Sequence, residues 1–147
     1  MEKINIMDCI FCEIINGNSP VSKIYEDEYV IAILDLFPLN TGHSLVIPKK
    51  HVEFIHELDD DTTGKMFNIG KKIGAAIRKT EIKPDGINLH LSDGRAAGQE
   101  IPHTHLHIIP RFKGDGSGFR FNNKSLAKRS ELNQLAEKIK IQLVINN

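Results

Sequence analysis

Three histidines occupy alternate positions late in the chain: His103, His105 and His107. Side chains two residues apart lie on the same face of a β-strand, so an extended segment here would present all three imidazoles together. Imidazole has an unperturbed pKa near neutral pH and acts as base, acid, nucleophile or metal ligand. A solvated sheet face more often carries Thr, Lys and Glu, so the pattern favours a chemical role over three half-exposed polar residues.

The spacing of the three histidines leaves two kinds of chemistry open. Same-face neighbours on a strand are roughly 6.5 Å apart, whereas zinc holds its nitrogen ligands at about 2.0–2.1 Å. Two neighbours can converge on one ion, but three on a straight strand converge poorly. The other possibility is a nucleophile in the middle, with flanking histidines that orient it, protonate a group or bind something else.

The residues on both sides of the triad resemble those of a known family. A Gly-Gln pair precedes the triad at 98–99, Pro-Arg follows it at 110–111, and Gly-His stands upstream at 42–43, followed by Ser-Leu-Val-Ile-Pro. With His-x-His-x-His and two apolar residues at 103–109, the chain resembles the histidine triad (HIT) family of nucleotide-binding hydrolases and transferases. The resemblance extends over about residues 9–111.

The resemblance implies a chemistry centred on His105. In the family the middle histidine attacks the α-phosphorus of a nucleotide, and water then hydrolyses the nucleotidyl-histidine intermediate. The family places His107 at the α-phosphate, Gln99 as an amide donor nearby, and His43 as a fourth histidine that supports the phosphate site. From the residue alone, His43 also fits a solvated position at a strand end.

The resemblance also assigns the nucleoside end of the site. Asp35 matches the acidic residue that accepts both ribose hydroxyls, and one carboxylate can accept two O–H groups. The apolar pocket for the base would be formed by Phe11, Ile14, Leu36 and Phe37. From the residues alone, Asp35 fits a turn or cap equally well, and the apolar side chains fit an ordinary core.

Three positions depart from the family's pattern or have no place in it. Ser92 stands where the family has an Asn near the ribose and phosphate, and serine has a shorter reach and no amide. We keep Ser92 among the nucleotide-binding residues. His90 and His56 have no family role, and we expect both to be surface or sheet residues.

The chain's two cysteines, Cys9 and Cys12, have Cys-x-x-Cys spacing, which indicates half a zinc site or a redox motif more readily than a disulfide. The spacing alone also fits two small buried residues on a short helix. Some relatives hold a structural zinc with such a pair, a histidine from another loop and the histidine two before the nucleophile. The resemblance therefore implies Cys9, Cys12, His51 and His103, a closed tetrahedral set. From the residue alone, His51 also fits the surface.

Composition bounds the remaining possibilities. The 147 residues suit one domain, 40% of them are hydrophobic, and Lys plus Arg equal Asp plus Glu at 19 each. A neutral chain gives no basic field for nucleic acid. We see no apolar run long enough for a signal peptide or a membrane span, so we expect a cytoplasmic protein that binds neither nucleic acid nor membrane.

The expected elements are a helix, three strands, a long helix, two strands and a last helix. We predict a helix over 9–16 capped by Asp8, strands over 23–26, 29–35 and 43–48, a helix over 62–80, strands over 87–91 and through the triad, and a helical segment over about 125–145 capped by Ser130. This order indicates an α+β fold with a mostly antiparallel sheet, in a single domain over 1–147 with its core at about 9–111. The resemblance implies five strands, a long helix packed on them, and a homodimer with a continuous ten-stranded sheet.

The leading hypothesis is an enzyme, a phosphoramidase or dinucleoside polyphosphate hydrolase that acts at the α-phosphate of purine nucleotide derivatives. Purine preference comes from the resemblance. The alternative is a nucleotide-binding regulatory protein with only residual hydrolysis. A zinc metallohydrolase that uses the triad as ligands is disfavoured by the linear spacing. The sequence leaves the leaving group open among an amine, a phosphate, a sulfate and a second nucleotide.

Overall fold

The computed structural model describes residues 8–116 and 126–143, and the chain divides into two compact units, Met1–Asp115 and Gly116–Asn147. The elements of the larger unit are α1 (Ile10–Ile15), β1 (Lys23–Glu26), β2 (Val30–Leu34), β3 (Ser44–Pro48), the 3-10 helix η2 (Ile55–Glu57), α2 (Asp60–Arg78), β4 (Gly86–His90), the 3-10 helix η3 (Arg95–Ala97) and β5 (Leu106–Arg111). The smaller unit contains α3 (Arg129–Gln142). A single domain over the whole chain stays a prediction.

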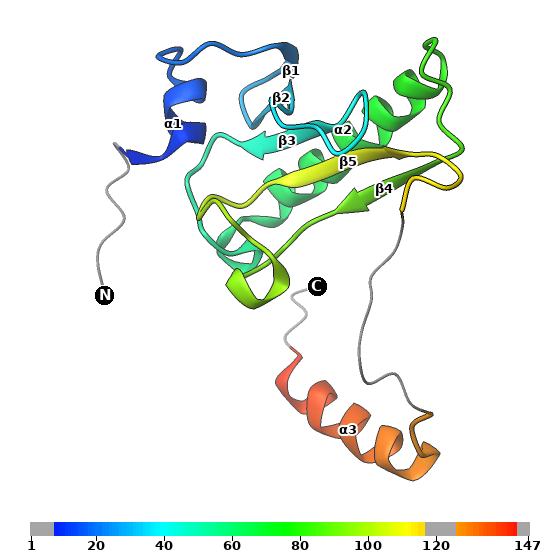
Figure 1. Ribbon diagram of the computed structural model, residues 1–147. Helices are drawn as coiled ribbons and strands as arrows, with labels where there is room; N and C mark the ends of the chain where they lie inside the picture. Colours follow the sequence, from blue (N-terminus) through cyan, green and yellow to red (C-terminus); the bar gives the residue numbers. More distant parts are fainter. Residues whose placement is uncertain (1–7, 117–125, 144–147) are drawn as a thin grey trace. The chain divides into compact units, whose positions relative to one another are not determined.

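The five strands form one antiparallel sheet in the order β1-β2-β3-β5-β4 (Figure 1). The side chain of Asp27 closes the β1–β2 turn by accepting from the backbone N–H groups of Tyr29 and Val30. Because β5 enters between β3 and β4, β4 lies at an edge of the sheet. The predicted α+β class with a five-stranded, mostly antiparallel sheet is confirmed.

α2 packs on one face of the sheet and forms the larger core with it (Figure 1). The helix begins two residues earlier than predicted because Asp59 caps it, accepting from the Thr62 backbone N–H at 2.8 Å. At Gly70 an added Cβ would lie 2.8 Å from a methyl of Leu106, so the glycine permits close approach to β5. The buried residues of this core include Val30, Val46, Met66, Ile69, Ile73, Leu106 and Ile108.

The opposite face of the sheet is aliphatic over β2 and β3 and carries imidazoles over β5 and β4. Cross-strand pairing aligns Ile33, Leu45, His107 and His90 in one row over β2, β3, β5 and β4. α1 packs beside the aliphatic part of this row, in a second core of Cys9, Phe11, Cys12, Ile31, Ile33, Leu45 and Ile47. The imidazole part on β5 and β4 therefore lies next to the α1 core.

The triad is not one continuous strand, so that prediction is wrong. β5 begins at Leu106, which leaves only His107 of the three histidines inside it. The backbone bends before the strand, where the N–H of His103 donates to the Ile101 carbonyl and that of Thr104 donates to the Val52 carbonyl. The bend frees His103 from the sheet face on which His107 lies.

Two predicted helix caps are also wrong. The N-cap of α1 is Cys9 rather than Asp8, and the N-cap of α3 is Lys128, which places Ser130 inside the first turn. Neither helix start has a side-chain cap hydrogen bond. α1 ends at Ile15, one residue before its predicted end, and Gly17 follows with a φ of 78°, which glycine adopts without strain. Residues 125, 144 and 145 of the predicted last helical segment lie outside the described residues.

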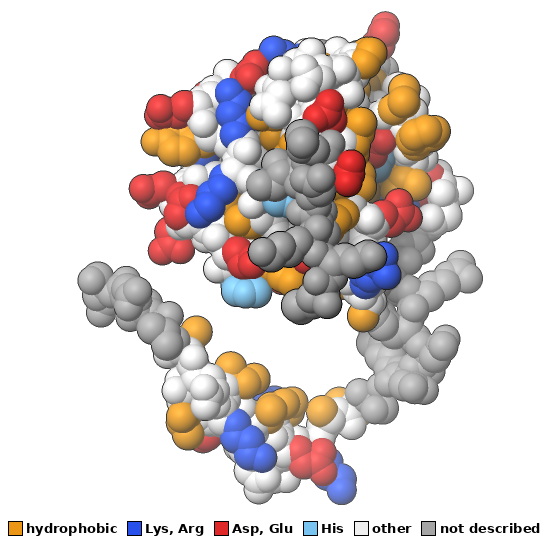
Figure 2. Space-filling view, turned by 90° about the vertical axis from the view of Figure 1, so that its left-hand side faces the viewer, with side chains coloured by type: hydrophobic (Ala, Val, Ile, Leu, Met, Phe, Trp, Pro, Cys, Tyr) orange, Lys and Arg blue, Asp and Glu red, His pale blue; other side chains and the backbone are white. Residues whose placement is uncertain are grey.

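The described surface carries charges of both signs. On the face shown in Figure 2, acidic and basic side chains are interspersed and hydrophobic side chains reach the surface among them, as expected from the equal numbers of acidic and basic residues. Within the described residues, no helix has the length and apolarity that crossing a membrane requires.

Candidate active site and metal centre

Four imidazoles gather on the sheet face opposite α2. The ring of His107 lies 4.8 Å from that of His105, 5.1 Å from that of His43 and 5.7 Å from that of His90, measured between ring centroids. His43 immediately precedes β3, His90 ends β4, His107 lies in β5, and His105 immediately precedes β5. The structure thus brings together the three histidines assigned to the phosphate, His43, His105 and His107, and adds His90 to them.

His105 has a fixed orientation and a defined lone pair. Its Nδ1 lies 2.8 Å from the carbonyl oxygen of His103, and because a carbonyl only accepts, Nδ1 carries the proton. In the neutral ring, Nε2 then holds the free electron pair. The Phe11 ring meets His105 edge-on at 4.9 Å, and burial lowers the pKa of His105, which favours the neutral ring.

His43 and His107 form a hydrogen-bonded pair whose proton positions follow from one backbone contact. The N–H of Leu39 donates to Nδ1 of His43 at 3.1 Å, so the proton of the neutral His43 ring lies on Nε2. That Nε2 is 2.8 Å from Nδ1 of His107, which must accept. The neutral His107 ring therefore carries its proton on Nε2, as a donor.

Burial keeps both rings of this pair neutral. It is the largest cause that lowers the pKa of His43, and it lowers the pKa of His107 to about 4, with His105 and His43 adding to the effect. Three neutral imidazoles with assigned tautomers can supply one nucleophilic nitrogen, on His105, and one N–H donor, on His107.

Asp35 has one oxygen committed to the local turn and one turned toward the histidines. The Phe37 backbone N–H donates to Oδ1 at 2.9 Å, which fits the turn role, and Oδ2 lies 3.6 Å from Nε2 of His43. Contact with ribose stays a prediction, and Oδ2 is the oxygen nearer to the histidines.

The amide of Gln99 is fully used by the backbone around it. Its Oε1 accepts from the Gly94 N–H at 2.8 Å, and its Nε2 donates to the carbonyls of Glu53 at 2.8 Å and Ile101 at 3.1 Å. These contacts tie the glycine-rich loop, residues 94–98, to the segment after β3. A catalytic role for Gln99 stays a prediction, and it requires the amide to release one carbonyl.

The apolar residues assigned to the base pocket differ in exposure. Phe11 is 4% exposed and Ile14 is partly buried against the α1 core, as the core interpretation of these two residues predicts. Leu36 is 84% exposed and Phe37 83% exposed. The part of all four in binding a base stays a prediction, and Leu36 and Phe37 are the most accessible of them.

Sequence reasoning missed the placement of His90. It faces His107 across β4 and β5, and its Nε2 lies 2.8 Å from Oγ of Ser92. A residue that pairs with a triad histidine on the neighbouring strand lies on the same face of the sheet. Without the strand register, that pairing could not be read from the sequence. His56 is exposed, as predicted.

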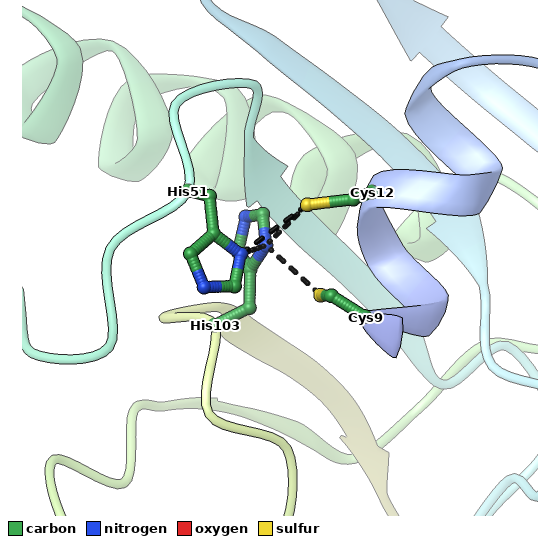
Figure 3. Close-up of side chains that lie close together, drawn as sticks. All are labelled: Cys9, Cys12, His51 and His103. Carbon is green, nitrogen blue, oxygen red and sulfur yellow. Dashed lines mark hydrogen bonds between the residues drawn. The ribbon is translucent and has the colours of Figure 1, made fainter. Parts of the chain in front are cut away.

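The second cluster of the larger unit joins α1 to the loop after β3 and to the bend before β5 (Figure 3). Sγ of Cys9 and Sγ of Cys12 lie 3.4 and 3.7 Å from Nδ1 of His103, and Nδ1 of His51 lies 3.2 Å from Sγ of Cys12 and 3.1 Å from Nδ1 of His103. The four predicted ligand residues therefore point toward one centre, and His51, which is partly exposed, is the least buried of them.

The tautomer of His103 fits a metal ligand. Its Nε2 lies 2.8 Å from the Pro48 carbonyl, so the proton lies there and the Nδ1 electron pair faces the cysteines. Burial raises the pKa of the Cys12 thiol to about 11, an effect that a bound cation would reverse by stabilising the thiolate. Two sulfurs and two nitrogens make the ligand set of a closed zinc site.

Asp35, His43 and His107 also bring three potential ligand atoms within 4.8 Å of one another. Here the hydrogen bonds oppose a metal. The Leu39 N–H occupies Nδ1 of His43, so a metal at Nε2 would force the ring proton onto a nitrogen that already faces a donor. This group is suited to holding protons, whereas the cysteine cluster is suited to holding zinc.

Comparisons with known proteins find relatives of the same fold and sequence pattern. A model of the HIT domain matches residues 16–114. A HIT family protein from Bacillus subtilis has a crystal structure with a TM-score of 0.85 at 41% identity, covering 95% of this chain and 99% of that one. A Zn-bound histidine triad family protein from Mycobacterium smegmatis has a TM-score of 0.73 at 38% identity, covering 94% and 96%. Adenylylsulfatase HINT3 of Arabidopsis thaliana is 46% identical over 108 residues, which are 74% of this chain and 54% of that protein.

Proposed function

The chain belongs to the HIT family, and from this premise we propose that it hydrolyses nucleotide derivatives at the α-phosphate through a nucleotidyl intermediate on His105. The observation that carries the proposal is the 2.8 Å contact between Nδ1 of His105 and the His103 carbonyl. It fixes the ring and leaves the Nε2 electron pair for attack. An activated and oriented nucleophile is the requirement of covalent catalysis.

In the first step, Nε2 of His105 forms a bond to the α-phosphorus while the bond to the leaving group breaks. Sulfate or phosphate leaves with the electron pair, and an amine leaves with the electron pair and a proton taken from the solvent. The imidazole gains positive charge, which the His103 carbonyl stabilises by accepting from Nδ1. In the second step, water adds to phosphorus, the phosphorus–nitrogen bond breaks, and one proton of water passes to the solvent. His105 returns to its neutral tautomer.

His107 is proposed to donate from Nε2 to a phosphoryl oxygen. The His43 pair holds its Nδ1 as the acceptor, so the donor is present before substrate binds. A donor fixed in advance stabilises negative charge that develops in the transition state. His43 therefore acts on substrate through His107.

The nucleoside end is proposed to use Asp35 for the ribose hydroxyls, through the oxygen that the Phe37 N–H leaves unused. Ser92 would contact the phosphate and ribose, and Leu36 would cover a purine base. Gln99 would complete the phosphate site if its side-chain Nε2–H group released one backbone carbonyl and donated to a phosphoryl oxygen instead.

The leaving group is proposed to be one that departs with little help. The relative named adenylylsulfatase HINT3 points to sulfate on adenylate, and the family pattern points equally to amines and phosphates. A phosphoramidate or a mixed anhydride fits a site whose donors and nucleophile are neutral imidazoles, because such bonds break more readily than phosphate esters.

Zinc is proposed to have a structural role at Cys9, Cys12, His51 and His103. The tautomer of His103 and the convergence of the ligand atoms support the site, and a closed set of four protein ligands leaves no position for water. The ion would link α1 to the segment that carries His105. We assign it no step in the reaction.

A homodimer is proposed to form through β4, which is an edge strand and exposes 47% of Leu89. Pairing of two such edges would give a continuous ten-stranded sheet. A cytoplasmic location, and the absence of nucleic acid and membrane partners, remain part of the proposal.

The test is a panel of adenosine and guanosine phosphoramidates, adenylyl sulfate and dinucleoside polyphosphates, assayed side by side. Acid quenching at early times followed by mass spectrometry should show one nucleotidyl group on the peptide that contains His105. Turnover without a covalent adduct would overturn the mechanism. Tight nucleoside monophosphate binding with turnover of the whole panel near background would favour a regulatory nucleotide-binding protein.

A further inference from the structure

His90 is placed by two independent features of the structure. The register of β4 against β5 puts it directly opposite His107, with ring centroids 5.7 Å apart. The turn of the chain after β4 brings Oγ of Ser92 to 2.8 Å from its Nε2. His90 therefore connects a histidine of the site to the residue that stands where the family has an Asn.

The hydroxyl of Ser92 lies inside the protein, beside the glycine-rich loop. Ser92 is 9% exposed, and its Oγ would be 3.6 Å from a Cβ added at Gly98. A hydroxyl has one proton and two lone pairs, so its use depends on the partner. When His90 donates to it, the proton of Ser92 is free for a second acceptor.

We propose that His90 is a positioning residue of the phosphate site, donating from Nε2 to Ser92 and directing the Ser92 hydroxyl proton to a phosphoryl oxygen of the nucleotide. The inference rests on the proposed function, since it takes the nucleotide phosphate as the ligand. An anion selects the arrangement in which donors point toward it, and the hydroxyl proton of Ser92 rotates about the Cβ–Oγ bond at little cost. A short serine then makes a contact for which the family uses a longer amide.

The electrostatics of the site agree with this placement. Burial first, and then repulsion among neighbouring imidazoles that include His90, lowers the pKa of His43 and His107, and the ring centroid of His90 lies 5.7 Å from that of His107, the proposed phosphate donor. A residue at this distance contributes to the phosphate end of the site rather than to the nucleoside end. Loss of His90 should therefore weaken ligands that carry a phosphate and spare those that lack one.

The experiment is a double-mutant cycle read by ligand binding. Calorimetry measures the dissociation constants of AMP and adenosine for wild type, His90→Leu, Ser92→Ala and the double variant. We expect His90→Leu to weaken AMP about tenfold, as for a hydrogen bond to a charged group, and to leave adenosine within about twofold. In the Ser92→Ala background, His90→Leu should have no further effect, because His90 acts through Ser92.

Two further variants separate positioning from folding. His90→Gln keeps an N–H donor near the same place and should restore most of the AMP affinity. His56→Leu removes an exposed histidine outside the site and should change neither ligand. Equal losses for AMP and adenosine, full additivity of the two substitutions, or unchanged AMP binding in His90→Leu would overturn the inference.

The same measurements distinguish this inference from the proposed mechanism. If wild type binds AMP and shows the cycle, but no adduct forms on His105, the covalent mechanism fails and the role of His90 stands. If the adduct forms and the cycle is additive, the role of His90 fails alone. Wild type that binds neither AMP nor adenosine would overturn both.

Discussion

Nε2 of His43 donates to Nδ1 of His107 across 2.8 Å, and the Leu39 backbone N–H decides the direction of this bond. The consequence is a neutral pair with its last proton on Nε2 of His107. Protonating either ring would place two donors face to face, at Leu39 and His43 or at His43 and His107. Protonation of this pair at low pH therefore destabilises the folded structure.

We predict that stability falls as the pH drops from about 6.5 to about 4. Burial lowers the pKa of His107 from 6.5 to about 4 in the folded protein, so in this window the unfolded chain binds a proton that the folded chain does not. Above about pH 6.5 the group makes no contribution to the pH dependence. Urea unfolding at several pH values in this range measures the effect.

His107→Asn should show a shallower loss of stability over the same window, because its side chain does not titrate. His56→Asn is the matched control, since it removes an exposed histidine, and its pH profile should follow that of wild type. Parallel profiles for wild type and His107→Asn would mean that His107 contributes nothing to the acid sensitivity.

The sheet and the long helix could be predicted because each depends on local patterns. Alternating or continuous apolar runs define β2 and β3, and Asp59 with its following acidic residues marks the start of α2. The triad could not be placed as well. Alternation predicted one strand from His103 through His107. In the structure, the N–H of Thr104 donates to the carbonyl of Val52, fifty-two residues away in the chain, and strand pairing starts only at Leu106.

The ligand set for zinc came from the family resemblance, and its convergence required the fold. Cys12 and His103 are ninety-one residues apart in sequence, and only the packing of α1 against the sheet brings them together. The placement of His90 also required the fold. Its type was visible, but its partner depends on the β4–β5 register, which no local pattern gives.

We predict that His105→Asn lowers turnover by several powers of ten while AMP binding stays within about tenfold of wild type. Asparagine keeps a polar group beside the His103 carbonyl but lacks the nucleophilic Nε2, so loss should fall on the chemical step. Single-turnover kinetics and calorimetry on the same preparation separate the two. If activity above about a tenth of wild type survives in protein free of wild-type contamination, His105 is not the nucleophile.

We predict that Asp35→Asn weakens AMP by about tenfold to a hundredfold and has a smaller effect on 2′-deoxy-AMP. A charged acceptor is lost at the ribose, and such hydrogen bonds contribute about 1.5–3 kcal/mol. The amide still accepts from the Phe37 N–H, so the turn should be retained. Equal losses for both nucleotides would assign Asp35 to the turn alone.

We predict one zinc ion per chain, bound by Cys9, Cys12, His51 and His103. Cys12→Ser should lose the metal and lower the melting temperature by roughly ten degrees or more, because binding energy at a structural site is folding energy. Metal binding requires both thiolates, so the metal affinity should fall as the pH decreases. Burial raises the pKa of Cys12 and so strengthens this dependence on pH.

The zinc prediction is decided by elemental analysis of protein purified without a metal-affinity tag. The matched comparison is wild type in strong chelator, which should approach the melting temperature of Cys12→Ser, and zinc should then restore wild type but not the variant. Because the ion orients the segment that carries His105, activity should be lost only as far as the fold is lost. Less than about a tenth of an equivalent of zinc, together with unchanged stability in chelator, would leave Cys9 and Cys12 as ordinary buried residues of the α1 core. His103 would then act only by holding His105 through its carbonyl and by binding Pro48 through Nε2.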